Sequence, residues 1–464
     1  MKSLAAAGTA SLLVIGPFLA NARSSCGPSP SGSIQPSIAS GYQVQVVATG
    51  LASPRGLTLD AQGNLLVVEQ DRGLISAHSL TEDNGCVSVS SSTDVTPALD
   101  LNHGIELSSD GSTLFASSDS TAYSWHYDAH ALTVSNRQEL VVNMAGSDHS
   151  TRTLLLSRNM PGMIVISRGS TANLDIQAAG ISSGIAQVKA FDLRNFSGPY
   201  DYGRDGLRLG WGLRNEVGIA EHPISGGIYG IENSADQIYR HGVDVHEDNP
   251  AEELNFLGFL SDSNDPDEGS NFGYPWCFSA WQVRDLPDNG NLSVGSQFAI
   301  SASPDLDNQN RTDAYCAEQT QPRLVFQAHM APLDIKFNDT GRQAWITFHG
   351  SWDRTEPVGY KLSVVHFNQN GDPVEPATSL TAVNDVFANQ DESRCPHHCF
   401  RPVGMALDHK GRIFMSSDTS GEIYLISARS GSSPNAAASI QALYRSEAAA
   451  YTLAAFVILL VLLL

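Results

Sequence analysis

The sequence is poor in basic residues, with 27 lysines and arginines against 49 aspartates and glutamates in 464 residues, a formal net charge of −22. This excess of negative charge argues against nucleic acid binding, because phosphates would be repelled. No long window of the chain has helical periodicity, so nothing predicts a helical domain. What the chain has instead is 40 glycines and 22 prolines spread along its length, which indicates many turns. The acidity fits a soluble, secreted protein.

The N-terminus has the features of a secretory signal peptide. Lys2 supplies the positive charge, residues 12–19 are mostly apolar, and Ala20-Asn21-Ala22 offers small residues for cleavage. We therefore expect residues 1–22 to be removed. Four N-x-S/T sequons agree with secretion, at Asn195, Asn291, Asn310 and Asn338.

The C-terminus has the order of a glycosylphosphatidylinositol (GPI) anchor signal. Residues 429–447 form a linker of small and polar residues, and residues 448–464 are mostly apolar with no charge after them. The predicted attachment site is Asn435-Ala436-Ala437. A true tail anchor is the alternative, although about 17 residues is at the short limit for spanning a bilayer. The expected location is the extracellular cell surface.

Six cysteines suit an oxidising compartment. Cys395 and Cys399, in "CPHHC", are expected to pair across a tight loop, since two cysteines with adjacent histidines lack the usual zinc spacing. Cys277 and Cys316 flank a polar insertion and could staple it. The remaining pair, Cys26 and Cys86, would tie the N-terminus down. Fifteen connectivities are possible, so spacing alone does not fix the pairing.

The main feature of residues 23–428 is self-similarity. An apolar strand, a polar turn ending in glycine, a second apolar strand, a Ser/Asp/Gly-rich stretch and a third strand recur in segments that begin at Ser53, Asn102 and Arg401. The scheme recurs more loosely in segments that begin at Arg152, Arg214 and Ala331. Six such units predict an all-β, six-bladed β-propeller. A β-sandwich is the alternative, but it would not explain sixfold recurrence.

Basic side chains and imidazoles gather at one position of the repeat. The innermost strand of a propeller blade starts at one face of the central channel, so residues at that start line the channel mouth. These positions hold Arg55, His103, His149 with Arg152, Arg214 with Asn215, His329, and Arg401. Each could make only a local salt bridge. As a set they predict a site for an anionic ligand.

The motifs "WGLRNEVGIAEHP", "SDHSTRTL", "ENSADQIY", "NFGYPWC" and "RPVGMALDHKGRIF" carry a resemblance to a known family. From about residue 40 to residue 428 the chain resembles the soluble aldose, sorbosone and fungal pyranose dehydrogenases that depend on pyrroloquinoline quinone (PQQ). Fungal multidomain relatives also carry a haem domain and a cellulose-binding module, neither of which is visible here.

The resemblance implies cofactor contacts from the ring of basic residues. PQQ is a tricarboxylated orthoquinone, so it needs cations around its edge. Arg214 and Asn215 would approach the reactive quinone carbonyl, because the planar fork of arginine suits such oxygens. Arg401 would hold a carboxylate. Arg55 and Asn233 complete the residues expected on this side.

Two positions depart from the family pattern. Where relatives place a cationic cofactor contact, often a lysine, this chain offers His349 or Arg354 in "FHGSWDR". A second arginine is typical two residues before Arg401, where this chain has Cys399. The anchoring of the cofactor is therefore expected to differ in detail.

The resemblance also assigns the chemistry. His149 would act as the general base that takes the proton from the sugar's anomeric hydroxyl, since an imidazole can titrate near working pH. Asp148 would hold the imidazole or accept from the ring or the substrate. His103 would line the sugar pocket. Tyr274 and Trp276 could stack on sugar or cofactor, with core packing as the alternative.

Calcium is implied in the same way. In relatives, backbone carbonyls of the segment matching "ENSAD" hold a Ca²⁺ ion that also touches PQQ, which corresponds here to Ser234 and Ala235. Hard oxygen ligands suit this ion. Asp236, Glu252 and Glu253 are nearby acidic candidates, with acidic surface loops as the commoner explanation.

The sequence thus predicts a PQQ- and Ca²⁺-dependent sugar dehydrogenase. It would oxidise the C1 hydroxyl of a pyranose to a lactone and pass electrons to an external acceptor such as a cytochrome or a quinone. One alternative is a calcium-dependent propeller lactonase or esterase, which would need several acidic side chains where this chain has arginine and histidine. Another is a non-catalytic binding propeller at the cell surface. Fold alone does not choose among them.

Overall fold

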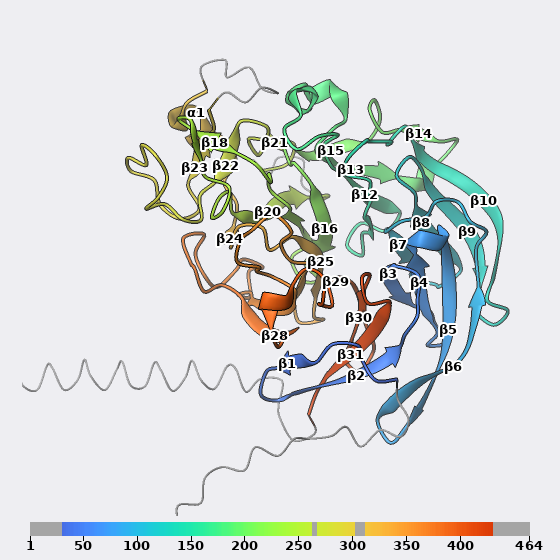
Figure 1. Ribbon diagram of the computed structural model, residues 1–464. Helices are drawn as coiled ribbons and strands as arrows, with labels where there is room; N and C mark the ends of the chain where they lie inside the picture. The colour runs from blue at the N-terminus through green and yellow to red at the C-terminus, as the bar shows by residue number, and fades with distance from the viewer. Residues whose placement is uncertain (1–29, 262–266, 302–310, 430–464) are drawn as a thin grey trace, which may run out of the picture.

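The computed structural model of the protein describes residues 30–261, 267–301 and 311–429 (Figure 1). Nearly all regular structure in these ranges is β-strand, and six sheets of four or five strands are arranged in a ring. The prediction of an all-β, six-bladed β-propeller is confirmed.

Each blade begins with its innermost strand. Blade 1 contains β3 (Pro54–Leu59), β4 (Leu65–Glu69), β5 (Leu74–Asp83) and β6 (Cys86–Asp94). Blade 2 contains β7 (Ile105–Leu107), β8 (Thr113–Ser117), β9 (Ala122–Asp128), β10 (Thr133–Val142) and β14 (Tyr200–Asp201). Blade 3 contains β11 (Leu154–Leu156), β12 (Met163–Arg168), β13 (Gln187–Asp192), β15 (Leu207–Trp211) and β21 (Ser270–Asn271).

The second half of the ring follows the same plan. Blade 4 contains β16 (Glu216–Glu221), β17 (Gly227–Glu232), β20 (Glu252–Phe259) and β24 (Leu324–Phe326). Blade 5 contains β25 (Pro332–Phe337), β26 (Gln343–Phe348), β27 (Lys361–His366), β28 (Asn384–Asn389) and β1 (Pro36–Ile38). Blade 6 contains β29 (Pro402–Leu407), β30 (Ile413–Ser417), β31 (Glu422–Ala428) and β2 (Tyr42–Ala48).

The ring is closed by the N-terminal end of the described chain. Strand β2 pairs antiparallel with β31, the last strand in the described part of the chain, and β1 pairs with β28. Figure 1 shows blue β2 beside red β31. The six inner strands contact one another in the order β3, β7, β11, β16, β25 and β29, and β29 returns to β3.

The recurring polar turn explains why the repeats fold alike. Between β3 and β4, one carboxylate oxygen of Asp60 accepts hydrogen bonds from the backbone N–H groups of Gln62 and Asn64. Gly63 has φ 81°, a left-handed conformation that favours glycine. Asp408 and Gly411 repeat this arrangement between β29 and β30. The turn therefore fixes where the second strand of the blade begins.

The widest gap in the repeat, within blade 4, holds the polar insertion. It carries two small sheets, β18 (Tyr239–Arg240) with β19 (Val243–Asp244) and β22 (Cys277–Ser279) with β23 (Gln297–Ala299), and the helix α1 (Asp313–Ala317). The disulfide Cys277–Cys316 staples it, as predicted. The pair Cys395–Cys399 is also confirmed. Cys86 is disulfide-bonded, but its expected partner Cys26 lies outside the described residues.

Several predictions fall on parts of the chain that the structure does not describe. These are the signal peptide at residues 1–22, the attachment site at residues 435–437 and the apolar tail at residues 448–464. Among the residues that are described, no helix has the length and apolarity needed to cross a membrane.

Candidate active site

The residues predicted to line the channel mouth do lie at one end of the channel. Arg55 is the second residue of β3, Arg214 and Asn215 immediately precede β16, and Arg401 immediately precedes β29. Hydrogen bonds join these starts from blade to blade. Asn102 donates to the carbonyl of Ser150 at 2.8 Å.

The orientation of His149 is set by Ser170, which follows β12. Nδ1 of His149 lies 3.0 Å from the backbone carbonyl of Ser170 and 3.0 Å from its hydroxyl. A carbonyl only accepts, so Nδ1 carries the proton of the neutral ring and Nε2 has a free lone pair. The side chain is 12% exposed. This is the tautomer and the orientation that a general base needs.

Burial lowers the pKa of His149, the nearby Arg214 guanidinium adds to this effect, and together they bring the pKa to about 3. The sequence predicted an imidazole whose pKa is near working pH. The difference arises because little water reaches the ring and a fixed cation lies beside it. His149 therefore stays neutral across the physiological range.

Asp148 does not orient the imidazole, contrary to one role predicted for it. Its carboxylate is half exposed and lies 3.9 Å from Nε2 of His149. The loop is held instead by Arg152, which is fully buried and donates to the carbonyls of Met144, His149 and Thr151. At this distance Asp148 can stabilise positive charge on the ring, and its exposure leaves the predicted contact with substrate open.

Arg214 uses all five of its N–H donors within the protein. Nε donates to the carbonyl of Asn173, and Nη1 donates to the carbonyls of Asn233 and Ser234. Nη2 donates to the Asn173 side chain and, at 2.8 Å, to Asp236. No donor is left for a cofactor oxygen, so the predicted direct contact through this guanidinium does not fit the structure. Arg214 instead fixes the loops around the mouth.

Unlike the guanidinium of Arg214, the side-chain amide of Asn215 is free to contact a ligand. Its side-chain amide makes no hydrogen bond with the described residues, although the residue is 9% exposed. A Cβ added at Gly169 would lie 2.6 Å from its Oδ1 and 2.7 Å from Cβ of His149, so the two side chains lie close together beside this glycine. The amide is thus available beside the proposed base.

The predicted calcium ligands lie in the loop that Arg214 holds. The carbonyl of Ser234 accepts a hydrogen bond from Nη1 of Arg214 at 2.5 Å, and the N–H of Ser234 donates to Glu252. Ala235 is fully buried. Glu252 and Glu253 are buried too, so they do not belong to a surface loop.

A second cluster lies where blades 1, 5 and 6 meet. Asp418 pairs with Nη1 of Arg55 at 2.8 Å and with Nε2 of His349 at 3.0 Å. These partners hold the pKa of Asp418 well below its usual range, against the effect of burial. Nε and Nη2 of Arg401 donate to the carbonyls of His349 and Gly350.

Two residues predicted to bind the cofactor make hydrogen bonds to other loops instead. Arg354 bonds to Asp248 and to the carbonyl of Glu247, away from His349. The side chain of Asn233 donates to the carbonyl of Pro332. Both tie one loop to another, and neither joins the cluster around Asp418.

Of the residues predicted to contact the substrate, one lies at the mouth and two are in the core. His103 is 4% exposed and lies near Arg55, and its Nδ1 has no hydrogen-bond partner among the described residues. Tyr274 and Trp276 are buried in a hydrophobic core cluster, so stacking on a ligand does not fit the structure. The hydroxyl of Tyr274 contacts the backbone at residues 172–175, close to Asn173.

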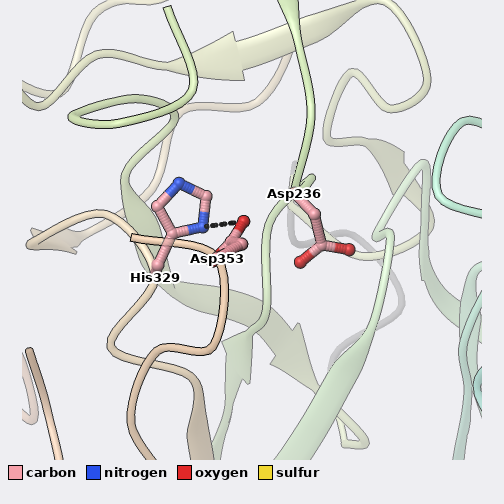
Figure 2. Close-up of side chains that lie close together, drawn as sticks. All are labelled: Asp236, His329 and Asp353. Carbon is pink, nitrogen blue, oxygen red and sulfur yellow. Dashed lines mark ion pairs between the residues drawn. The ribbon is translucent and has the colours of Figure 1, made fainter. Parts of the chain in front are cut away.

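A third cluster joins blades 4 and 5 (Figure 2). It consists of Asp236, His329 and Asp353, with one candidate ligand atom from each within 4.8 Å of the others. The sequence placed His329 at the mouth and Asp236 among the acidic candidates, but it did not single out Asp353.

Comparison with known proteins decides the family. Residues 36–429 match the TrAA12-like family. The chain belongs to the TrAA12-like family. It is 43% identical over 399 residues to a PQQ-dependent sugar dehydrogenase of Hypocrea jecorina, covering 84% of this chain and 89% of the relative. It is 40% identical to a PQQ-dependent pyranose dehydrogenase of Coprinopsis cinerea, covering 88% of this chain but only 56% of that longer relative.

Solved structures agree with this assignment. The calcium structure of the Trichoderma reesei Family AA12 carbohydrate-active enzyme superposes with a TM-score of 0.82 at 43% identity, over 86% of this chain and 98% of that one. The holo form of the pyranose dehydrogenase PQQ domain from Coprinopsis cinerea gives 0.79 at 39% identity, over 87% and 99%. The resemblance seen in the motifs is confirmed.

Three residues of this TrAA12-like mouth were not found from the sequence: Ser170, Asn173 and Asp418. Asp418 stands in "SSDTSG", and the same repeat position in blade 2 reads "SSDSTA". The repeat could therefore have identified it. Ser170 and Asn173 lie in a loop without a counterpart in the repeats, so only the fold shows what they contact.

Proposed function

We propose that this TrAA12-like chain is a PQQ-dependent sugar dehydrogenase. It oxidises the C1 hydroxyl of a pyranose to the lactone and passes the electrons to an external acceptor, a cytochrome or a quinone. The observation that carries the proposal is the neutral His149, whose bare Nε2 lies at a mouth surrounded by cationic groups with donors to spare.

The residues at the mouth fit a tricarboxylated quinone. Nε of Arg55 and Nδ1 of His103 are buried without hydrogen-bond partners in the described part of the chain. Nη1 of Arg401 and the amide of Asn215 are likewise unused there. Buried polar atoms of this kind are costly unless a ligand satisfies them. PQQ, when bound, supplies the oxidant that accepts the hydride.

The side chains at the mouth would accept the proton and hold the base in its orientation. His149 accepts the proton of the anomeric hydroxyl at Nε2, while Ser170 fixes the ring through Nδ1. Asp148, 3.9 Å away, stabilises the imidazolium that forms. Arg214 holds the surrounding loops so that the base does not have to reorganise.

The sugar needs an apolar surface, and the exposed Trp352 supplies one. Its loop follows β26, which runs antiparallel to the inner strand β25, so the loop lies at the mouth end of the channel. The residue is 63% exposed, in contrast to the buried Tyr274 and Trp276. We place the face of the sugar on this ring.

We also propose a Ca²⁺ site and a cellular location. The carbonyls of Ser234 and Ala235 would hold a Ca²⁺ ion, which supplies a Lewis acid when bound. The Ser234 carbonyl has a second lone pair beyond the one that Arg214 uses. A secreted chain, held at the cell surface by a GPI anchor or a tail anchor, fits the signals at the two ends of the sequence.

The test is reconstitution. Purified apo-protein is mixed with PQQ and Ca²⁺, offered a panel of simple sugars with a dye acceptor, and followed by dye reduction and by the quinone absorbance. We expect reduction that needs PQQ and one or more pyranoses. Absence of both a spectral change and turnover across the panel would favour the hydrolase or the binding protein.

A further inference from the structure

The cluster of Asp236, His329 and Asp353 has no part in the proposed reaction (Figure 2). Asp236 follows β17, His329 precedes β25, and Asp353 lies in the loop after β26. The fold thus brings together side chains that are up to 117 positions apart in the sequence (353 − 236 = 117), with ligand atoms within 4.8 Å of one another. Three atoms this close can contact one ion.

Asp353 lacks the partners that a buried carboxylate requires. Its side chain is 2% exposed, and neither oxygen has a hydrogen-bond partner among the described residues. Nδ1 of His329 lies 3.3 Å from this carboxylate, and the imidazole of His246 is also close enough to interact with it electrostatically. A buried charge without compensation is strongly unfavourable, so a positive species belongs beside these oxygens.

His329 presents a lone pair to that carboxylate. Nε2 of His329 contacts the backbone carbonyl of His246, and a carbonyl only accepts, so Nε2 carries a proton. In the neutral ring Nδ1 is then an acceptor that faces another acceptor on Asp353. A metal-binding histidine is oriented in this way, with its other nitrogen donating to a carbonyl.

Asp236 closes the cluster on its open side. Its side chain is 27% exposed, so solvent reaches the cluster there. One of its oxygens accepts from Nη2 of Arg214 at 2.8 Å, which leaves the other available. In Figure 2 the carboxylate of Asp353 lies between His329 and Asp236.

We propose that Asp236, His329 and Asp353 bind one divalent metal ion through their side chains. The Ser234 carbonyl lies close by, since Arg214 donates to it and to Asp236, but this site binds through side chains and does not depend on PQQ. Two carboxylates accept many divalent ions, but the imidazole nitrogen favours Mn²⁺ or Zn²⁺ over Ca²⁺. Asp236 would then bridge the metal to Arg214, so that the ion helps to order the mouth.

The test measures binding to the full chain, free of metal and of PQQ. Mn²⁺ is titrated by calorimetry, and its coordination is followed by electron paramagnetic resonance. We expect one site that binds Mn²⁺ more tightly than Ca²⁺. Asp353→Asn should weaken Mn²⁺ binding by about 100-fold or more, and His329→Gln by about 10- to 100-fold. Asp288→Asn, at an 83% exposed side chain, is the matched control and should bind as the wild type does.

The competing occupant is a proton, which would make His329 an imidazolium paired with Asp353. Thermal unfolding of the metal-free protein separates the two cases. If the carboxylates lack a cation, Asp353→Asn raises the Tm of the metal-free protein and abolishes the Tm increase that Mn²⁺ gives the wild type. A lower Tm in the variant identifies the ion pair and overturns the proposal, as does Mn²⁺ binding that Asp353→Asn leaves unchanged.

Discussion

The two ends of the central channel are built from the same six strands, but they hold their charged groups differently. At the mouth, where the inner strands begin, cationic and imidazole groups keep unsatisfied donors and lone pairs, as Arg55, His103 and His149 do. At the opposite end, where these strands finish, a cavity of about 1280 Å³ is lined by charges of both signs. Lys336 pairs with Asp334 there, and Glu106 lies nearby.

The comparison shows that the larger cavity is not the end of the channel suited to bind an anionic ligand. The cavity at the far end is spacious, yet its charges largely compensate one another. The mouth contains a base whose pKa is lowered, and the far end contains Glu106, an acid whose pKa burial raises to about 7. Ionisable groups with shifted pKa values occur at both ends, but only the mouth combines them with uncompensated donors, which a bound anion would satisfy.

The largest effect is expected from removing the base. His149→Ala should lower kcat by about 10²- to 10⁴-fold, the usual contribution of general base catalysis, while PQQ still binds. The measurement is turnover with a saturating sugar, together with a PQQ titration. His409→Ala, at an exposed histidine lining the far end, is the matched control and should leave kcat unchanged. Retained activity in His149→Ala would end the assignment.

Arg214 is expected to contribute to stability as much as to catalysis. Arg214→Ala leaves Asp236 and the carbonyls of Asn173, Asn233 and Ser234 without their donors, and should lower the free energy of unfolding by about 3 kcal/mol. Arg204→Ala is the control. Arg204 is 81% exposed in its pair with Asp201, and its loss should cost less than about 1 kcal/mol. Equal denaturation midpoints for the two variants would refute the structural role.

The sugar-stacking role of Trp352 should affect KM more than kcat. Trp352→Ala removes an exposed ring that contacts substrate but not the reacting atoms, so KM should rise about 10-fold, equivalent to about 1.4 kcal/mol. Ile224→Ala removes an equally exposed apolar side chain from a turn at the far end and should change neither constant. A fall in kcat with KM unchanged would contradict stacking.

The sequence predicted where residues lie in the propeller better than it predicted the hydrogen-bond partners of their side chains. The starts of the inner strands follow from the repeat, so His149, Asn215 and Arg401 were correctly expected at one mouth. Whether a guanidinium there is free depends on loops outside the repeat. Asn173 and the segment after β17 use every donor of Arg214, and no pattern in the chain indicates this. The sequence left open whether Trp276 stacks on a ligand or packs in the core, because the packing of the insertion around it is a tertiary property.

At the far end, Glu106 should make stability depend on pH. Its pKa is raised from an ordinary value near 4.5 to about 7, so between these values the unfolded chain releases a proton that the folded chain keeps. The penalty is absent below pH 4.5 and complete above pH 7. Glu106→Gln removes it, so the variant should gain about 1 kcal/mol over the wild type at pH 8, after allowance for partial exposure, and nothing at pH 4.5. Denaturant unfolding at both pH values checks this, and an equal difference at both would contradict it.

The smallest expected effect is at the mouth, in the acid limb of turnover. The lowered pKa of His149 means that the ring stays unprotonated as pH falls through 6.5, so kcat/KM for the free enzyme should not decline there on its account. The base would be lost only below about pH 4. The profile is measured from pH 4.5 to 8 in enzyme that remains folded throughout. A limb with a pKa of 6 to 7 that titrates with His149 would mean that water reaches the ring, and that the mouth is less desolvated than its burial implies.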